Sequence, residues 1–109
     1  KSPINLLVHD TAGLFVSYRG ALSFETKIKL PNTKNSPCVT CQAPCLTKCP
    51  VGAFSNQSYD SSACISHIKS IDSQECTTNG CAARRACPIS KTYGRLPEQS
   101  AFHMQAFIK

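Results

Sequence analysis

The chain is 109 residues long, about the size of one small domain, and 41% of its residues are hydrophobic while 17% are charged. This composition argues against an intrinsically disordered chain, and no apolar run approaches the roughly 20 residues that a membrane-spanning helix needs. The formal net charge of +6 would by itself suggest an acidic partner or nucleic acid, but the chain also contains eight cysteines, whose chemistry weighs more.

Residues 1–30 contain no cysteine and are predicted to be an N-terminal β-hairpin segment. The apolar runs INLLVHD (4–10) and LFVSY (14–18) flank a short link that contains Gly13, which is typical of a hairpin. The chain does not begin with methionine, so we expect this segment to be the end of a longer N-terminal region. Residues 25–37, rich in lysine and asparagine and containing two prolines, predict a loop or linker.

Residues 31–109 contain all the cysteines and are predicted to form short helices and loops. Asp60 suits the N-cap of a helix whose apolar face would comprise Cys64, Ile65, Ile68 and Ile71. TTNG (77–80) predicts a turn, and CAARRAC (81–87) predicts two short helical turns that end at Pro88. A C-terminal helix is expected to begin near Pro97 and to pack back through Phe102 and Ala106. The fold class is therefore small α+β.

The spacing of the cysteines from residue 38 to residue 49 is C-x2-C-x3-C-x3-C-P. A CxxC pair points both sulfurs at one centre, and a third thiol shortly after it completes a three-point grasp. The fourth thiol, Cys49, precedes Pro50, which extends the chain and directs that thiol to a second centre, as in two-cluster ferredoxins. The spacing therefore favours two iron–sulfur clusters, although one gap here is x3 where the ferredoxin pattern has x2.

Two other uses of the cysteines remain open. Eight is an even number, as a disulfide framework requires, but the tight spacing from Cys38 to Cys49 suits neither loop closure nor bridge geometry. Zinc sites usually show two CxxC knuckles, and only one is present; His67 and His103 have no ligand spacing. The alternative function is thus a zinc- or disulfide-stapled interaction domain with no redox role.

The motifs PCVTCQAPCLTKCPVGAF (37–54), YDSSACISHI (59–68) and GCAARRACP (80–88) resemble the two-cluster ferredoxin module of epoxyqueuosine reductase and its relatives. The chain is more similar still to a set of bacterial ferredoxin-like proteins with YRGAL, CPVGAF and AFHM signatures, and that resemblance covers residues 5–107. It implies a ferredoxin-like domain built around two [4Fe-4S] clusters, preceded by the hairpin and followed by the C-terminal helix.

The resemblance also implies the ligands. Cys38, Cys41, Cys45 and Cys87 would hold cluster 1, and Cys49, Cys64, Cys76 and Cys81 would hold cluster 2. The second motif departs from the family pattern, because five residues separate Cys81 from Cys87 and Cys76 must replace the missing middle thiol. Cluster 2 is therefore expected to be the more labile.

The expected function is electron transfer through both clusters, as a carrier or as a relay module of a larger redox protein. We expect no catalytic residues, because the chain shows no nucleophile–base spacing, no GxGxxG motif and no P-loop. The partner would be a redox protein or an attached domain in the cytoplasm. Since the clusters would offset the positive charge, nucleic acid is not expected as a partner, and neither is a membrane. Arg84 and Arg85 either offset cluster charge or form a solvated helix face.

Overall fold

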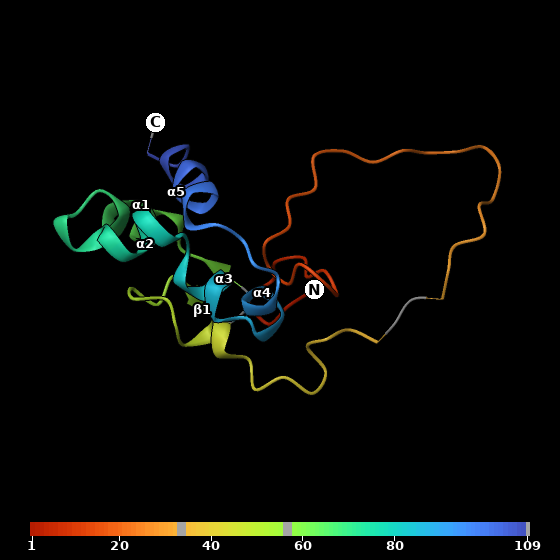
Figure 1. The fold of residues 1–109 in the computed structure, drawn as a ribbon, viewed down its shortest axis with the longest axis horizontal. Helices are drawn as coiled ribbons and strands as arrows, with labels where there is room; N and C mark the ends of the chain where they lie inside the picture. Colours follow the sequence, from red (N-terminus) through yellow and green to blue (C-terminus); the bar gives the residue numbers. More distant parts are fainter. Residues whose placement is uncertain (33–34, 56–57, 109) are drawn as a thin grey trace.

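The computed structural model describes residues 1–32, 35–55 and 58–108. Its elements are short, and two strands pair antiparallel into one small sheet, so the fold is small α+β (Figure 1). In chain order they are η1 (Pro44–Leu46), β1 (Phe54–Ser55), β2 (Ser58–Tyr59), α1 (Ser61–Ile68), η2 (Ile71–Ser73), α2 (Gln74–Asn79), α3 (Ala82–Ala86), α4 (Pro88–Thr92) and α5 (Pro97–Gln105). No helix in the described part of the chain is both long and apolar enough to cross a membrane.

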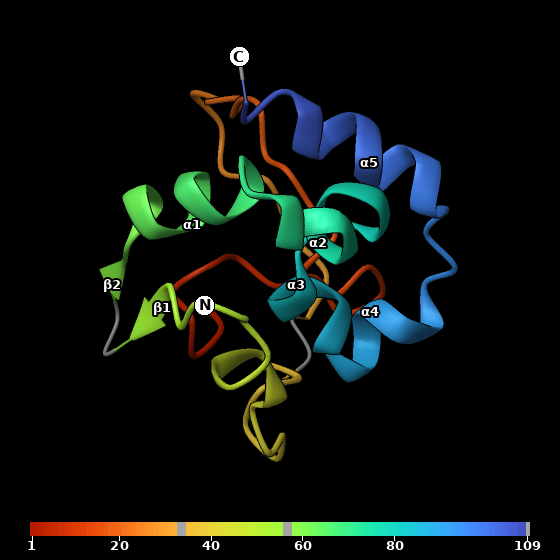
Figure 2. The same ribbon diagram turned by 90° about the vertical axis from the view of Figure 1, so that its left-hand side faces the viewer.

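The elements form two neighbouring groups. Helix α5 packs mainly on α2, whereas α3 packs on η1 and on α4 (Figure 2). A buried core joins residues of both predicted segments; its members are Ile4, Leu14, Cys45, Phe54, Ala83 and Cys87. Two of the predicted ligands therefore lie in the hydrophobic core itself.

Helix α1 starts where the sequence predicts. The Asp60 side chain accepts a hydrogen bond from the backbone N–H of Ala63 at 2.9 Å, which confirms it as the N-cap. The helix ends earlier than expected, at Ile68, where the carbonyl of His67 accepts from both the backbone N–H of Ser70, at 3.0 Å, and the Ser70 hydroxyl, at 2.7 Å. Ile71 consequently lies in η2 and is exposed, so its predicted place on the apolar face is wrong.

The turn expected at residues 77–80 is also wrong over most of its length, because α2 continues to Asn79. Gly80 ends the helix with a positive φ of 86°. A Cβ at Gly80 would lie 2.6 Å from the Cβ of Ser100 on α5, so glycine is what allows the two helices to approach. The TTNG sequence therefore corresponds to the end of α2 and to the close contact of Gly80 with α5.

The last three helices agree with the sequence in position but differ in detail. Helix α3 ends before Cys87 as expected, yet Pro88 does not end helical structure; it occupies the first turn of α4. Helix α5 begins at the predicted Pro97 and packs back on the body. Its buried residues are Ser100 and Met104, while Phe102 is 78% exposed, so the predicted Phe102–Ala106 face is wrong.

The hairpin predicted over residues 4–18 does not form as a ladder. In the described residues its only pairing is an isolated bridge between His9 and Gly13. The backbone of Leu14 bonds to side chains instead of to a partner strand: its N–H donates to the Ser90 hydroxyl at 2.9 Å, and its carbonyl accepts from Arg84 at 3.0 Å. Because the body takes both polar groups, the segment 4–18 becomes part of the core rather than a separate sheet.

Residues 17–32 run as an extended excursion away from the body (Figure 1). No helix or strand forms in residues 17–32 or 35–43, in keeping with the loop predicted at 25–37, of which residues 33 and 34 lie outside the described part. The run ALSF (21–24) likewise forms no strand.

Candidate metal centres

Four cysteines lie together around η1 and the junction of α3 with α4. Burial raises the pKa of the Cys45 thiol, and the neighbouring thiols of Cys87, Cys38 and Cys41 raise it further by charge repulsion. The thiols of Cys38, Cys41 and Cys87 are therefore near enough to Cys45 to act on its charge. They are the four that the resemblance implies for cluster 1.

Local backbone geometry positions this group. The Cys41 N–H donates to the carbonyl of Cys38 at 3.3 Å, which closes a turn across the CxxC pair. Ala43 has a left-handed φ of 53° and ends that turn, so that Cys45 enters η1 and becomes buried. The backbone N–H of Ala43 points at the sulfur of Cys41, at 3.4 Å.

A cavity of about 690 Å³ opens at the same place. Cys38, Cys41 and Cys87 line it, together with Val8 and Ile89. The space at the group is therefore bounded by thiols on one part of its wall and by apolar side chains on another. This fits a bulky cofactor that needs both anionic ligands and protection from water.

The other four cysteines form a second group, beside α1, α2 and α3. Burial raises the pKa of the Cys76 thiol, the backbone N–H of Ala82 and the charge of Arg85 lower it, and the thiols of Cys81 and Cys49 raise it. Burial raises the pKa of Cys64, a hydrogen bond with Tyr59 lowers it, and the same two thiols, Cys81 and Cys49, raise it. These four are the cysteines that the resemblance implies for cluster 2.

Cys49 is the most informative member. By sequence it belongs to the run that starts at Cys38, but the thiols whose pKa it raises are those of Cys64 and Cys76. Its sulfur accepts a hydrogen bond from the backbone N–H of Ala53 at 3.3 Å. The chain thus turns Cys49 away from the first group, as the Cys-Pro step suggested.

Tyr59 adds a hydroxyl to the second group that the sequence analysis did not anticipate. Burial and a hydrogen bond with Cys64 raise the pKa of Tyr59. Its ring stacks on Phe54 across the β1–β2 pair, with ring centroids 4.9 Å apart. The only sequence signal was the position of Tyr59 before the helix cap Asp60, and that gives no hint of a contact with a thiol.

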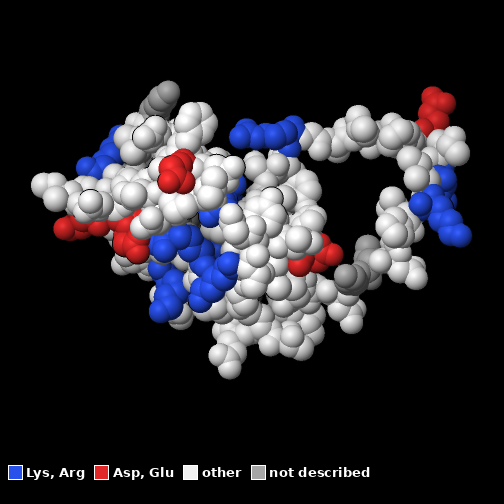
Figure 3. Space-filling model, viewed as in Figure 1, with Lys and Arg blue, Asp and Glu red and all other residues white. Residues whose placement is uncertain are grey.

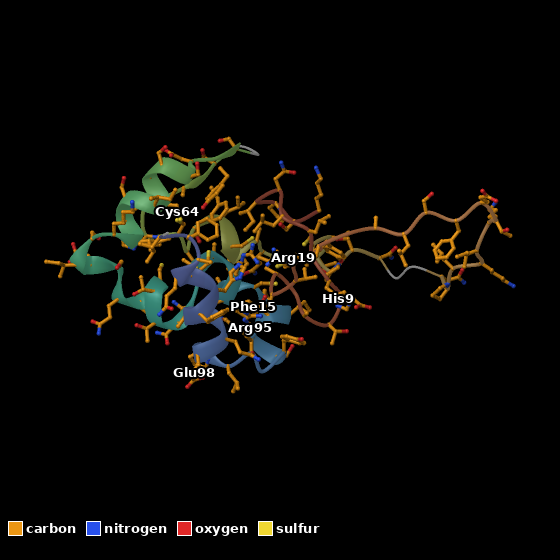
Figure 4. The ribbon with its side chains drawn as sticks, turned by 90° about the horizontal axis from the view of Figure 1, so that it is seen from above. His9, Phe15, Arg19, Cys64, Arg95 and Glu98 are labelled. Carbon is orange, nitrogen blue, oxygen red and sulfur yellow. The ribbon has the colours of Figure 1, made fainter. Side chains whose placement is uncertain are left out.

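A second cavity, of about 290 Å³, reaches the group at Cys64 and Cys81. Phe15 from the N-terminal segment and Met104 from α5 also line it. Arg95 stands 5.4 Å over the Phe15 ring; Figure 4 shows these two together in the middle of the molecule and Cys64 nearer the end formed by α1. The second group is therefore also bordered by apolar and aromatic side chains.

The two arginines of α3 are more than a solvated face. Arg84 binds the carbonyl of Leu14, and Arg85 donates to the carbonyl of Gly80 at 3.1 Å and pairs with Glu75 at 3.3 Å. Arg85 also lowers the pKa of Cys76 through its charge. Basic side chains gather over this middle part of the body (Figure 3).

All eight cysteines lie in the described part of the chain, and each has a free thiol. Among the described residues, no three His, Cys, Asp or Glu side chains are close enough to hold one metal ion. The cysteines are therefore related through their effects on one another's pKa, and their role as ligands stays a prediction. His67 and His103 do not join either group.

Comparison with family models, with curated proteins and with solved structures gave no match for this chain. The resemblance to ferredoxin modules therefore rests on the quoted motifs alone.

Proposed function

We propose that the protein transfers electrons through two [4Fe-4S] clusters, as a ferredoxin-like carrier or as a relay module of a larger redox protein. The strongest support is that Cys38, Cys41 and Cys87 act on the pKa of Cys45, whereas Cys49 and Cys81 act on the pKa of Cys64 and Cys76. A single binding site does not need such a crossover, whereas two-cluster ferredoxins depend on it. The partner would be a redox protein or an attached domain, in the cytoplasm, and neither nucleic acid nor a membrane.

Cluster 1 would be held by Cys38, Cys41, Cys45 and Cys87, and cluster 2 by Cys49, Cys64, Cys76 and Cys81. Each cluster would supply a site that accepts and releases one electron. The ligand sulfurs of a four-iron cluster lie farther apart than those of a single zinc ion, because the iron–sulfur core stands between them. Thiols that would hold a cluster therefore do not have to converge on one point. The free thiols in both groups are compatible with this arrangement.

The chain's own contribution is to favour the ionised form of the sulfurs and to exclude water. Ala43 and Ala53 direct backbone N–H groups at the sulfurs of Cys41 and Cys49, at 3.4 and 3.3 Å. Such donors stabilise thiolate and raise the reduction potential of the centre that the thiolate holds. Without a cation between them, the buried thiols disfavour one another's ionised form, which is the direction of their pKa shifts.

The test is anaerobic purification followed by iron and acid-labile sulfide determination and electron paramagnetic resonance after reduction. We expect a brown protein with about eight iron and eight sulfide atoms per chain and spectra of two reduced clusters. Colourless protein that contains zinc, or whose thiols are all blocked as disulfides, would overturn the proposal in favour of a stapled interaction domain.

A further inference from the structure

Residues 21–30 alternate in polarity along the excursion that leaves the body. From residue 22 to residue 30, every second side chain is apolar except Thr26, and the side chains between them are polar or charged. The first set is Leu22, Phe24, Thr26, Ile28 and Leu30; the second is Ser23, Glu25, Lys27 and Lys29. A period of two over nine residues is the pattern of a β-strand with one face buried.

In the structure this strand pattern has no partner. Leu22 and Leu30 are 86% and 74% exposed, and Phe24 and Ile28 are 61% and 50% exposed. The backbone of residues 21–30 makes no hydrogen bond to another described residue. Figures 1 and 3 show the segment standing clear of the body, with an open gap between them and with acidic and basic side chains at its far end. An extended, half-apolar segment in this state is an open strand edge.

We propose that residues 21–30 pair with the same segment of a second copy of this chain, as antiparallel strands related by a two-fold axis at Thr26. The segment is complementary to itself in that register. Opposite positions sum to 52, so Leu22 faces Leu30 and Phe24 faces Ile28. On the other face Glu25 lies opposite Lys27 of the partner copy, and the symmetry makes this ion pair twice.

The neighbouring registers are disfavoured by charge. A shift of the axis to Glu25 places the two Glu25 side chains opposite each other, and a shift to Lys27 does the same to two lysines. Like charges directly opposite each other destabilise a strand pair. A register shift by one residue would pair the apolar face of one strand with the polar face of the other, and leucines would then lie opposite charged side chains. Only the axis at Thr26 satisfies both faces of the segment.

The paired ribbon would present its apolar side chains on one face, and such a ribbon is marginal without further packing. Exposed apolar residues lie at both ends of the excursion, Tyr18 on the side of the N-terminus and Val39 at the start of the cysteine run. We expect the apolar face of the ribbon to close over these parts of the two bodies. The excursion would then be a dimerisation arm rather than a linker.

The test uses charge reversal and mixing of the full chain, purified anaerobically. Glu25→Lys places lysine opposite Lys27, and Lys27→Glu places glutamate opposite Glu25, so each variant alone should be a monomer by sedimentation equilibrium where the wild type is a dimer. Mixed together they should restore the dimer, because each copy then meets opposite charge at both positions. Both variants keep a net positive charge, so general attraction does not explain such a recovery.

Lys29→Glu is the matched control, since it changes the charge by the same amount but faces Ser23, and it should stay dimeric. A wild type that remains monomeric at high micromolar concentration would overturn the proposal and assign the segment to a different polypeptide. A dimer that neither reversal weakens would also overturn it, since the contact would then lie elsewhere. These outcomes do not depend on whether the clusters are present, which iron analysis of the same samples reports separately.

Discussion

The hydroxyl of Ser90, on α4, accepts a hydrogen bond from the backbone N–H of Leu14 at 2.9 Å, across 76 positions of sequence. Both residues are buried, and among the described residues the Leu14 side chain is the largest that is almost wholly enclosed. This contact fixes the N-terminal segment to the helix that follows Cys87. It therefore links the hydrophobic core to one of the candidate ligands of cluster 1.

Replacing Ser90 with alanine should destabilise the protein by about 1–3 kcal/mol, because a buried backbone N–H then loses its acceptor. Chemical denaturation of the anaerobic protein measures this. Ser66→Ala, at an exposed position in the middle of α1, is the control and should change stability by less than about 0.5 kcal/mol. Equal effects of the two substitutions would contradict the role assigned to Ser90.

At Gly13 the N-terminal segment passes close to α4. It has a φ of 58°, and an added Cβ would lie 2.5 Å from the backbone nitrogen of Ser90. Gly13→Ala combines the left-handed penalty with a steric clash, so we expect a loss of about 2–5 kcal/mol. Gly94 separates the conformational penalty from the steric clash, because it has a φ of 70° but open space around it. Gly94→Ala should therefore lower the free energy of unfolding by only about 1–2 kcal/mol. A smaller loss at Gly13 than at Gly94 would refute the close approach.

The sequence predicted those elements whose causes are local. The Asp60 cap, the Pro97 start of α5 and the grouping of the first CxxC pair depend on neighbours within a few residues. The predicted hairpin failed because Ser90 and Arg84, far away in sequence, take the backbone groups of Leu14. No local pattern contains that competition.

In the candidate site, too, the sequence predicted the local features and missed the long-range contacts. Spacing alone indicated that Cys49 leaves the first group, whereas the place of Cys76 came from the resemblance. Tyr59 was missed because its contact with Cys64 arises from the β1–β2 pair, which has two residues in each strand and no clear signal. The loop predicted from residue 25 onward cuts across the alternation of residues 22–30, and the structure leaves that segment unpaired.

Stability should fall on acidification below about pH 6.5, the ordinary pKa of histidine. Burial lowers the pKa of His103, and Arg84, Arg95 and Arg19 lower it further by their positive charge. Below pH 6.5 the histidine is protonated in the unfolded chain but remains neutral in the folded chain. The free energy of unfolding therefore decreases as the pH falls toward the lowered pKa of His103.

Thermal unfolding at neutral pH and at mildly acidic pH should show a smaller decrease for His103→Gln than for the wild type. His67→Gln, on α1, controls for the loss of an imidazole elsewhere. Identical pH dependence in the wild type and in His103→Gln would show that the arginines around His103 do not act on it in this way.

The two cysteine groups should lose iron independently. Cys41→Ser removes a proposed ligand of cluster 1 and Cys76→Ser a proposed ligand of cluster 2, so each should lower the iron content from about eight atoms per chain to about four. The Cys41 variant should also lose much of its stability, because Cys45 and Cys87 of the same group lie in the core and metal binding is coupled to folding. Thr40→Ser, beside Cys41, should keep all its iron. An unchanged iron content in both cysteine variants would contradict the ligand assignment.

Tyr59 should tune the second cluster only. A hydrogen bond with Cys64 is among the causes that raise the pKa of Tyr59, and a donor to a ligand sulfur would stabilise the reduced, more negative state of a cluster. Tyr59→Phe removes that donor but keeps the ring that stacks on Phe54, so the reduction potential of cluster 2 should fall while cluster 1 keeps its value. A redox titration followed by electron paramagnetic resonance measures both potentials, and Tyr93→Phe, at an exposed position, is the control. If the Tyr59 variant shifts neither potential, or both equally, then the hydroxyl does not act on cluster 2.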